Sequence, residues 1–301
     1  MTAVISPKIS TNVRNSVRLF AARTPLVLLD ELSESLAARL AIRMFLRPPR
    51  HAFPAMEQQW LQQAQHGQLH TAGLPIAEWN GQAMRTYRWG RADKGRVVLM
   101  HGWGGRATQM GYFIAPLLAA GYEVHAIDAP GHGLSTGQQS SVLHFWHALE
   151  RLVASIGPTD AVIAHSLGGG ATTLAVSAGL SVGKVVLISP SADLHAYAKE
   201  FTSLLRLPDR LRLAMQRQLE TRLGLLWDDV NAIQAATRAK LPALVIHDED
   251  DKEVGVAIGR AIANGWRGAE WLATQGLGHR RILKSEQTIL AALRFIAGDG
   301  S

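Results

Sequence analysis

Short apolar runs, separated by longer segments with helical spacing, dominate the chain from residue 96 onward. Runs that are apolar on both faces are typical of strands buried in a parallel sheet. Helices on both sides of the sheet must supply that burial, so the pattern predicts an α/β fold with a doubly wound, mostly parallel sheet. The predicted strands cover residues 97–100, 124–127, 162–164, 185–188 and 244–246, and a last strand is expected at 269–274.

The segment before this sheet has a different pattern. Leucines and a phenylalanine recur at near-helical spacing over residues 29–45, with charged residues between them, and two prolines follow at 48–49. This spacing predicts an amphipathic helix that ends at the prolines. Further on, an Asn-Gly pair at 80–81 separates two apolar stretches, residues 77–79 and 84–89, which predicts an antiparallel hairpin at the edge of the sheet.

The alternation of strands and helices stops after the fourth predicted strand. Three helical segments are expected there instead, at residues 194–207, 209–226 and 228–238. The chain is therefore predicted to have three parts. They are a helical N-terminal extension with a basic tail at residues 1–75, an α/β core at 76–192 and 242–301, and a helical insertion at 193–241.

Composition limits the classes of function. The 301 residues are 47% hydrophobic and 18% charged, as expected for a globular protein. No apolar run is long enough to span a bilayer and no secretory signal is recognisable, so a cytoplasmic location is the expectation. The absence of cysteine excludes disulfides, thiolate metal ligands and a cysteine nucleophile.

The charge distribution bears on possible partners. The formal net charge is +7, but the arginines are scattered and form no cationic block or aromatic-and-basic motif, so we expect no nucleic-acid partner. The first acidic residue is Asp30, and four cations precede it. Residues 1–46 are therefore a candidate for weak contact with a membrane surface. A disordered tail, a targeting presequence and a helix packed on the protein are the alternatives.

One serine occupies a turn at which the backbone must be strained. Ser166 falls between a predicted strand and a helix-compatible segment that begins at Leu167. Such a turn requires very small residues two positions away on either side, and Ala164 and Gly168 meet that requirement. The residues A-H-S-L-G resemble the G-x-S-x-G nucleophile elbow of the α/β-hydrolase family, with alanine for the first glycine. A helix start with a capping serine is the alternative interpretation.

Two loops that follow predicted strands add to this resemblance. Residues 101–105, H-G-W-G-G, are similar to the family's H-G-x-G loop, which implies that the backbone amides of Trp103 and Leu167 form an oxyanion hole. A phosphate cradle is the alternative, but no Gly-Lys-Ser/Thr follows. The next strand leads into D-A-P-G-H-G-L-S, which resembles the family's D-x-P-G-x-G-x-S loop. We expect Asp128 and His132 in it to build a turn rather than to take part in catalysis.

A serine nucleophile needs a base that is itself oriented by a carboxylate. In this family the acid follows the nucleophile along the chain. The sequence H-D-E-D-D-K-E-V at residues 247–254 resembles the family's H-G-x-x-D-x-x-V-P acid loop, which implies that Asp251 is the acid. Asp248 and Asp250 are competitors, and Asp193 occupies the alternative position after the preceding strand. The carboxylates could instead hold a divalent cation, although their spacing is not that of an EF-hand.

The histidine of the family follows the acid in chain order. His279 is the only histidine after the acid loop, and it follows Gly276-Leu277-Gly278 directly before a helix expected for residues 282–297. The resemblance implies that His279 is the general base, and a surface-loop histidine is the alternative.

The resemblance covers roughly residues 95–297 and rests on four motifs in the family's order. It implies a serine hydrolase that cleaves a carboxylic ester of a small-molecule acyl substrate through an acyl-enzyme, with no metal and no organic cofactor. The inserted helices match the position of the cap that gates many members. The alternatives are a thioesterase or a peptidase using the same residues, and a non-catalytic binding protein with the hydrolase fold.

Overall fold

The computed structural model describes residues 11–192 and 194–298. The chain divides into two compact units, a helical unit of residues 1–45 with 194–227 and a sheet unit of residues 46–193 with 228–301. This division differs from the three parts expected from the sequence, because the N-terminal helices and the inserted helices form one unit. No helix within the described ranges combines the length and apolar character needed to cross a membrane.

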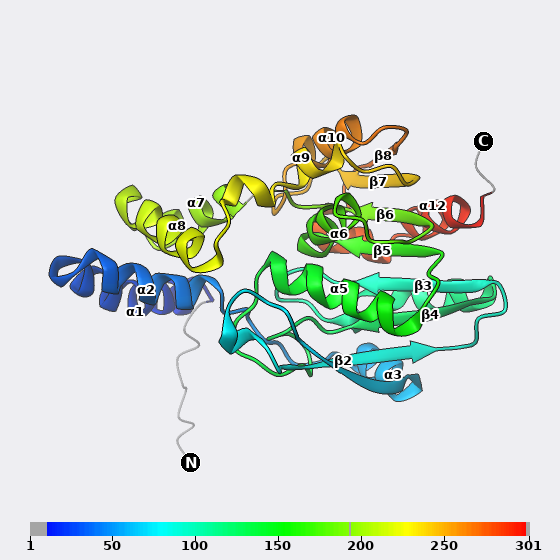
Figure 1. The fold of residues 1–301 in the computed structure, drawn as a ribbon, viewed down its shortest axis with the longest axis horizontal. Helices are drawn as coiled ribbons and strands as arrows, with labels where there is room; N and C mark the ends of the chain where they lie inside the picture. The colour runs from blue at the N-terminus through cyan, green and yellow to red at the C-terminus, as the bar shows by residue number, and fades with distance from the viewer. Residues whose placement is uncertain (1–10, 193, 299–301) are drawn as a thin grey trace, which may run out of the picture. The chain divides into compact units, whose positions relative to one another are not determined.

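The sheet unit contains, among the described residues, one sheet of eight strands in the order β1-β2-β4-β3-β5-β6-β7-β8 (Figure 1). Neighbouring strands from β4 to β8 run parallel, whereas β2 runs antiparallel to both β1 and β4. The predicted fold class and the six predicted strands are confirmed. The strands are β1 (Gln65–His70), β2 (Ala83–Trp89), β3 (Gly95–Met100), β4 (Tyr122–Ile127), β5 (Ala161–His165), β6 (Lys184–Ile188), β7 (Ala243–Asp248) and β8 (Glu270–Thr274).

Helices cover both faces of this sheet (Figure 1). One face carries α5 (Val142–Ile156), α6 (Leu167–Ser177), α9 (Ala232–Ala236) and α10 (Val256–Gly265), and the other carries α4 (Ile114–Ala119) and α12 (Glu286–Ala297). Shorter elements complete the unit: α3 (Ala55–Gln63), η1 (Ala77–Trp79), η2 (Ala107–Phe113), α11 (Gly278–Arg281) and η4 (Ile282–Lys284). The arrangement is doubly wound, as the apolar strands require.

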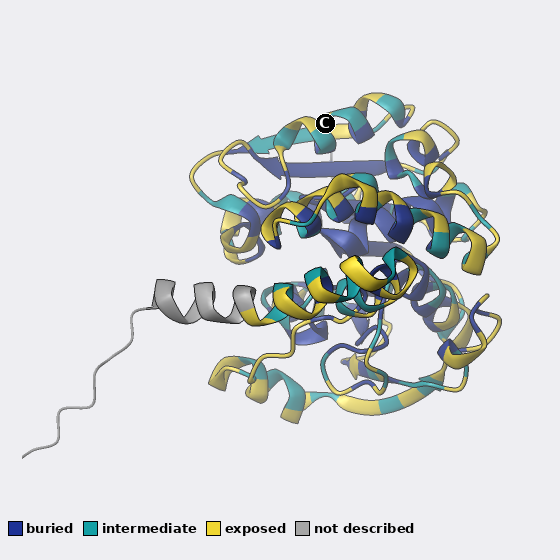
Figure 2. Ribbon diagram, turned by 90° about the vertical axis from the view of Figure 1, so that its left-hand side faces the viewer, coloured by how far each residue is buried: buried dark blue, intermediate teal, exposed yellow. Residues whose placement is uncertain are grey.

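The centre of the sheet is the core of the unit. Every residue of β4, β5 and β7 is buried, and the central strands are dark blue in Figure 2. Strands that are shielded on both faces pack tightly and move little, so the loops at their carboxyl ends start from a rigid support. Ser166, the loop after β7 and the loop of residues 101–105 after β3 all begin at such ends.

The predicted hairpin is wrong in its first strand. Residues 77–79 form the 3₁₀ helix η1, and β2 pairs instead with β1, from Gln65 opposite Arg88 to His70 opposite Ala83. The Asn80 side chain explains the difference, because it accepts from the Leu74 amide and donates to the Leu74 carbonyl, which closes the long loop between the strands. The strand β1 was not predicted because its residues, Q-H-G-Q-L-H, do not alternate between apolar and polar.

The helical unit consists of α1 (Thr11–Leu32), α2 (Glu34–Phe45), α7 (Leu194–Leu204) and α8 (Asp209–Leu223). The helix α2 packs on α1 and α8, and three of its four buried residues are alanines, which let helices approach closely. The guanidinium of Arg210 on α8 donates to both carboxylate oxygens of Asp30 on α1, at 2.8 and 2.6 Å. Residues far apart in sequence thus share one small core.

Several of the predicted helices have different bounds in the structure. The single helix expected for residues 29–45 is two helices, because α1 continues through Pro25 and α2 begins after a break at Ser33, whose Oγ accepts from the Leu36 amide at 3.4 Å. The helix expected for residues 228–238 is divided into η3 (Trp227–Val230) and α9. Lys8 in the basic tail and Asp193, the alternative acid, lie outside the described residues.

Candidate active site

Ser166 occupies the turn between β5 and α6 with φ 54° and ψ −121°, a conformation that L-residues rarely adopt. The strain is held by neighbours that cannot be larger. A Cβ on Gly168 would lie 2.3 Å from the His101 carbonyl oxygen, and one on Gly102 would lie 2.8 Å from the Ser166 Cβ. Ala164, which stands for the first glycine of the elbow, is fully buried in β5. The serine is thus at a sharp strand-to-helix turn, as predicted.

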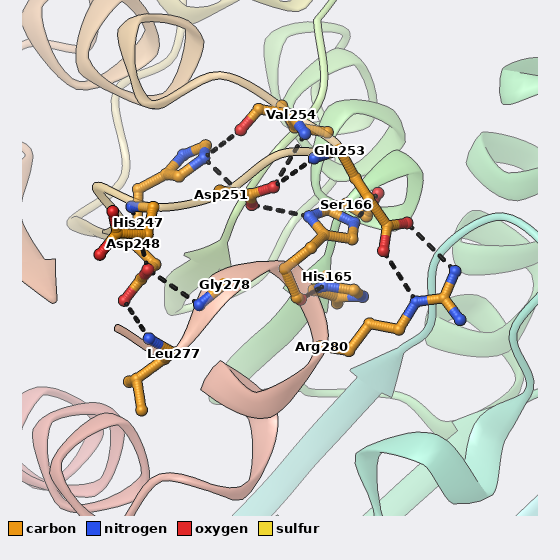
Figure 3. A network of polar contacts seen from close by, with 12 residues as sticks. His165, Ser166, His247, Asp248, Asp251, Glu253, Val254, Leu277, Gly278 and Arg280 are labelled. Carbon is orange, nitrogen blue, oxygen red and sulfur yellow. Dashed lines mark hydrogen bonds and ion pairs between the residues drawn. The ribbon is translucent and has the colours of Figure 1, made fainter. Parts of the chain in front are cut away.

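The structure brings together the three side chains predicted from the ordered motifs, and Figure 3 labels Ser166 and Asp251 among them. The Nε2 of His279 lies 3.0 Å from Ser166 Oγ, and its Nδ1 lies 2.7 Å from Asp251 Oδ2. All three residues are buried, at 6 to 8% exposure. Ser166 follows β5, Asp251 lies in the loop after β7, and His279 lies in the short helix α11, all within the sheet unit. A hydroxyl, an imidazole and a carboxylate in this order can transfer a proton away from the hydroxyl.

The aspartates of the acid loop have different partners. Asp251 contacts His279 through one oxygen, and its other oxygen accepts from the amides of Glu253 and Val254, both at 2.9 Å. Burial alone would raise the pKa of Asp251, but hydrogen bonds from His247, His279 and the Val254 amide lower it far below its ordinary value. Asp251 is therefore the ionised carboxylate on the imidazole.

Asp248, one competitor for the acid, holds the loop that carries the histidine. Its carboxylate accepts from the Thr274 hydroxyl at 2.7 Å and from the Leu277 and Gly278 amides at 3.1 and 2.8 Å. Burial acts to raise the pKa of Asp248, but these hydrogen bonds lower it overall. Asp250, the other competitor, accepts from the Gly276 amide at 2.9 Å. Both aspartates thus tie the acid loop to the residues just before His279.

Two histidines beside these residues were not assigned a role from the sequence. His247 is fully buried, donates through Nε2 to the Val254 carbonyl at 2.9 Å and lies 3.4 Å from Asp251 Oδ2 (Figure 3). His165 donates through Nε2 to the backbone carbonyl of His279 at 2.9 Å, and the centroids of the two imidazole rings are 4.6 Å apart. His165 directly precedes Ser166 in the A-H-S-L-G motif, and His247 directly precedes Asp248 in the acid loop. Only their contacts show that they hold the acid and the histidine.

Leu167 follows Ser166 directly, and Gly102, the residue before Trp103, lies so close to the serine that a Cβ on it would be 2.8 Å from Ser166 Cβ. Trp103 lies in the loop after β3, and Leu167 is the first residue of α6, where a backbone amide has no acceptor within the helix. In the part of the chain that the structure describes, neither amide donates to a protein group. Two such donors beside Ser166 could bind a negatively charged oxygen.

The loop after β4 is a turn built around a buried carboxylate. Asp128 accepts from the Tyr87 hydroxyl and the Ala107 amide, both at 2.7 Å, and from the Leu134 amide at 2.8 Å. Burial raises the pKa of Asp128 in spite of these hydrogen bonds. His132 on the same loop accepts from the Gly104 amide of the loop after β3 at 3.0 Å. The loops after β3 and β4 are therefore bonded to each other.

We predict that the protein loses stability steeply on acidification below about pH 6.5. Burial lowers the pKa of His101 to about 4 and those of His132, His144 and His165 to about 3. The unfolded chain binds these protons at the higher, ordinary pKa, so stability falls as the pH drops from the unfolded toward the folded values. Each histidine should cost more than about 1 kcal/mol per pH unit within this window.

Urea unfolding at a series of pH values between about 7 and about 5 measures this loss. The variant His144→Leu removes one of the buried imidazoles and should make the pH dependence shallower by about one proton. Equal unfolding free energies across the series would contradict the prediction.

The chain is similar to known proteins in sequence and in fold. Residues 97–292 match the model of the alpha/beta hydrolase family. The chain is 30% identical over 209 residues to the dihydrolipoyllysine-residue acetyltransferase component of an acetoin cleaving system from Cupriavidus necator, covering 66% of this chain and 52% of that protein. It is 37% identical over 97 residues to the pimeloyl-acyl-carrier-protein methyl ester esterase of Sodalis glossinidius, covering 32% of this chain and 36% of that one.

The chain thus spans about half and about a third of the length of these two relatives. Among solved structures, a monoacylglycerol lipase from Paleococcus ferrophilus is similar in fold, with a TM-score of 0.57, 22% identity and coverage of 72% of this chain and 99% of the lipase. The family match extends over well more than half of the sequence and includes Ser166, Asp251 and His279. The chain belongs to the alpha/beta hydrolase family.

Proposed function

We propose that this protein is a serine hydrolase that cleaves a carboxylic ester through an acyl-enzyme. The observation that carries the proposal is the unbroken chain of contacts from Ser166 Oγ through His279 to Asp251, at 3.0 and 2.7 Å. A serine hydroxyl is a weak nucleophile unless a base can take its proton. The strained turn supports the same role, because it presents the Oγ clear of strand and helix.

The proposed reaction has two halves. In the first, Ser166 Oγ attacks the acyl carbon while His279 Nε2 takes the hydroxyl proton, and the same imidazole then gives that proton to the departing alcohol. In the second, His279 removes a proton from a water molecule as the water oxygen attacks the acyl carbon, and the imidazolium then gives that proton to Ser166 Oγ as the acid leaves. Asp251 stabilises the imidazolium in both halves, and the Trp103 and Leu167 amides stabilise the oxyanion.

An ester is the substrate class favoured by the comparisons. The relative from Sodalis glossinidius is named a methyl ester esterase, and the structural neighbour from Paleococcus ferrophilus is named a lipase. Both names describe hydrolysis of carboxylic esters. A thioester or amide substrate would use the same residues, so it is an outcome for the test below rather than a second proposal.

We expect hydrolysis of p-nitrophenyl esters, with an optimum chain length between acetate and laurate that reports the size of the acyl pocket. Initial rates across this series are the measurement, with matched thioesters and anilides of the best acyl group beside it. A fluorophosphonate probe should label Ser166, which peptide mass spectrometry can locate. Thioesters as the best substrates would change the class, and a wild-type protein that neither turns over any substrate nor reacts with the probe would overturn the proposal.

A further inference from the structure

Two buried imidazoles join the loop of residues 101–105, here called the oxyanion loop, to the loop after β4, and each ring binds the other loop. His101 lies in the oxyanion loop and accepts, through Nε2, from the Ala129 amide of the other loop at 3.0 Å. His132 lies in that other loop and accepts, through Nε2, from the Gly104 amide of the oxyanion loop at 3.0 Å. The two rings pack against each other with centroids 5.1 Å apart. Each loop thus holds a backbone amide of its neighbour.

The hydrogen bonds determine the tautomer of both rings. The Nδ1 of His101 donates to the Gly102 carbonyl at 2.7 Å, and the Nδ1 of His132 donates to the Pro130 carbonyl at 3.0 Å. Each Nε2 must then be an acceptor, because a backbone amide can only donate. Burial favours this neutral form, since it lowers the pKa of His101 to about 4 and of His132 to about 3. Arg106 and Arg50 act in the same direction on His101 and His132 respectively.

These contacts hold both peptide groups that flank Trp103. The carbonyl of Gly102 accepts from His101 Nδ1 and also from the Gly105 amide at 3.0 Å. In a trans peptide the N–H and the C=O point in opposite directions. Because the Gly102 carbonyl points toward His101 Nδ1 and the Gly105 amide, the N–H of Trp103 points away from them. The following peptide is held at its own N–H, because the Gly104 amide donates to His132.

The oxyanion loop needs such support because its glycines allow many conformations. Gly104 has φ +66°, and a Cβ on Gly105 would lie 2.8 Å from the Gly102 carbonyl oxygen, so larger residues are excluded at both positions. Glycine-rich backbone is flexible unless hydrogen bonds restrain it. An oxyanion donor stabilises a transition state only when it is oriented before the reaction begins.

We propose that His101 and His132 are positioning residues that together orient the Trp103 amide as an oxyanion donor. The inference rests on the proposed function, because it assigns a cause to the geometry of that same site. Neither imidazole is proposed to touch the substrate. His101 acts on the peptide before Trp103 through its carbonyl, and His132 acts on the peptide after it through its amide.

The test compares three substitutions at His101 and His132 with one control substitution at another buried histidine. His101→Leu and His132→Leu each remove one imidazole, and His132→Gln keeps an acceptor oxygen for the Gly104 amide. The control is His144→Leu, which also removes a fully buried imidazole but one that packs on Trp79 and contacts Ser141 instead of the oxyanion loop. All variants are assayed well below their melting temperatures.

Three quantities are measured for each variant: kcat and KM for the best p-nitrophenyl ester, and the inhibition constant of an alkyl boronic acid. In the boronate complex, Ser166 Oγ bonds to boron and its proton passes to His279, which leaves a negatively charged tetrahedral boronate whose oxygen occupies the oxyanion site. We expect both leucine variants to lower kcat about ten- to a hundredfold, less than the roughly 10²- to 10³-fold loss from removing a whole oxyanion donor. KM should change less than about threefold, and boronate affinity should fall in parallel with kcat.

The control and the glutamine variant separate positioning from simple destabilisation. His144→Leu should keep the wild-type kcat and boronate affinity, and His132→Gln should recover most of the kcat lost in His132→Leu. Leucine variants with wild-type kcat and boronate affinity would overturn the inference while leaving the hydrolase proposal intact, and so would a control that loses as much as they do. A wild-type protein that neither hydrolyses the ester nor binds the boronate would overturn the hydrolase proposal and the inference with it.

Discussion

Replacement of Ser166 by alanine is expected to lower kcat for ester hydrolysis by about 10⁴- to 10⁶-fold. The hydroxyl is the only group on His279 Nε2 that could form a covalent bond to an acyl carbon, among the contacts of the described residues. Without it, water must attack directly, and only the oxyanion donors and substrate binding remain to accelerate the reaction. Single-turnover and steady-state rates on the best p-nitrophenyl ester measure the loss, with melting temperature as the check on folding.

The matched control is Ser189→Ala. Ser189 also follows a central strand, is fully buried and has a positive φ of 45°, but its Oγ has no hydrogen-bond partner among the described residues. Removal of this hydroxyl should leave kcat within about twofold of wild type. Equal rates for wild type and Ser166→Ala would exclude the proposed nucleophile.

Replacement of Asp251 by asparagine should lower kcat by about 10⁴-fold. Asp251 Oδ1 accepts two backbone amides, so the asparagine oxygen should take that position and its amino group should face His279. An amino group there donates to Nδ1, and the imidazole must then carry its proton on Nε2. That tautomer cannot accept the proton of Ser166.

Asp248→Asn is the informative partner of this variant. Each oxygen of the Asp248 carboxylate accepts two hydrogen bonds. In asparagine one of these oxygens becomes an amino group, which would face two hydrogen-bond donors and could accept from neither. We expect a loss of roughly 1–3 kcal/mol of stability, seen as a lower melting temperature, and a much smaller loss of kcat than in Asp251→Asn. If Asp248→Asn lost as much kcat as Asp251→Asn without a change in melting temperature, the assignment of the acid would be wrong.

The fold and the positions of the candidate residues could be predicted because they depend on local sequence. Central strands are apolar on both faces, and a strained elbow admits only very small neighbours, so β5, Ser166 and Gly168 were recognisable without a structure. The order of the motifs along the chain placed His279 after Asp251. The edge strand β1 was missed because strand pairing at an edge needs little apolar character.

The sequence alone determined the fold class and the set of residues from which the candidate site is built. Burial and backbone strain each require particular residue types, and these can be recognised within a single segment of the chain. Only the tertiary structure decided which of the neighbouring aspartates contacts His279, that Asp248 holds the adjacent loop, and that His101 and His132 join two loops. Those choices depend on where hydrogen-bond donors from distant segments meet a given side chain. The spacing of residues within one segment does not indicate which distant segments contact it.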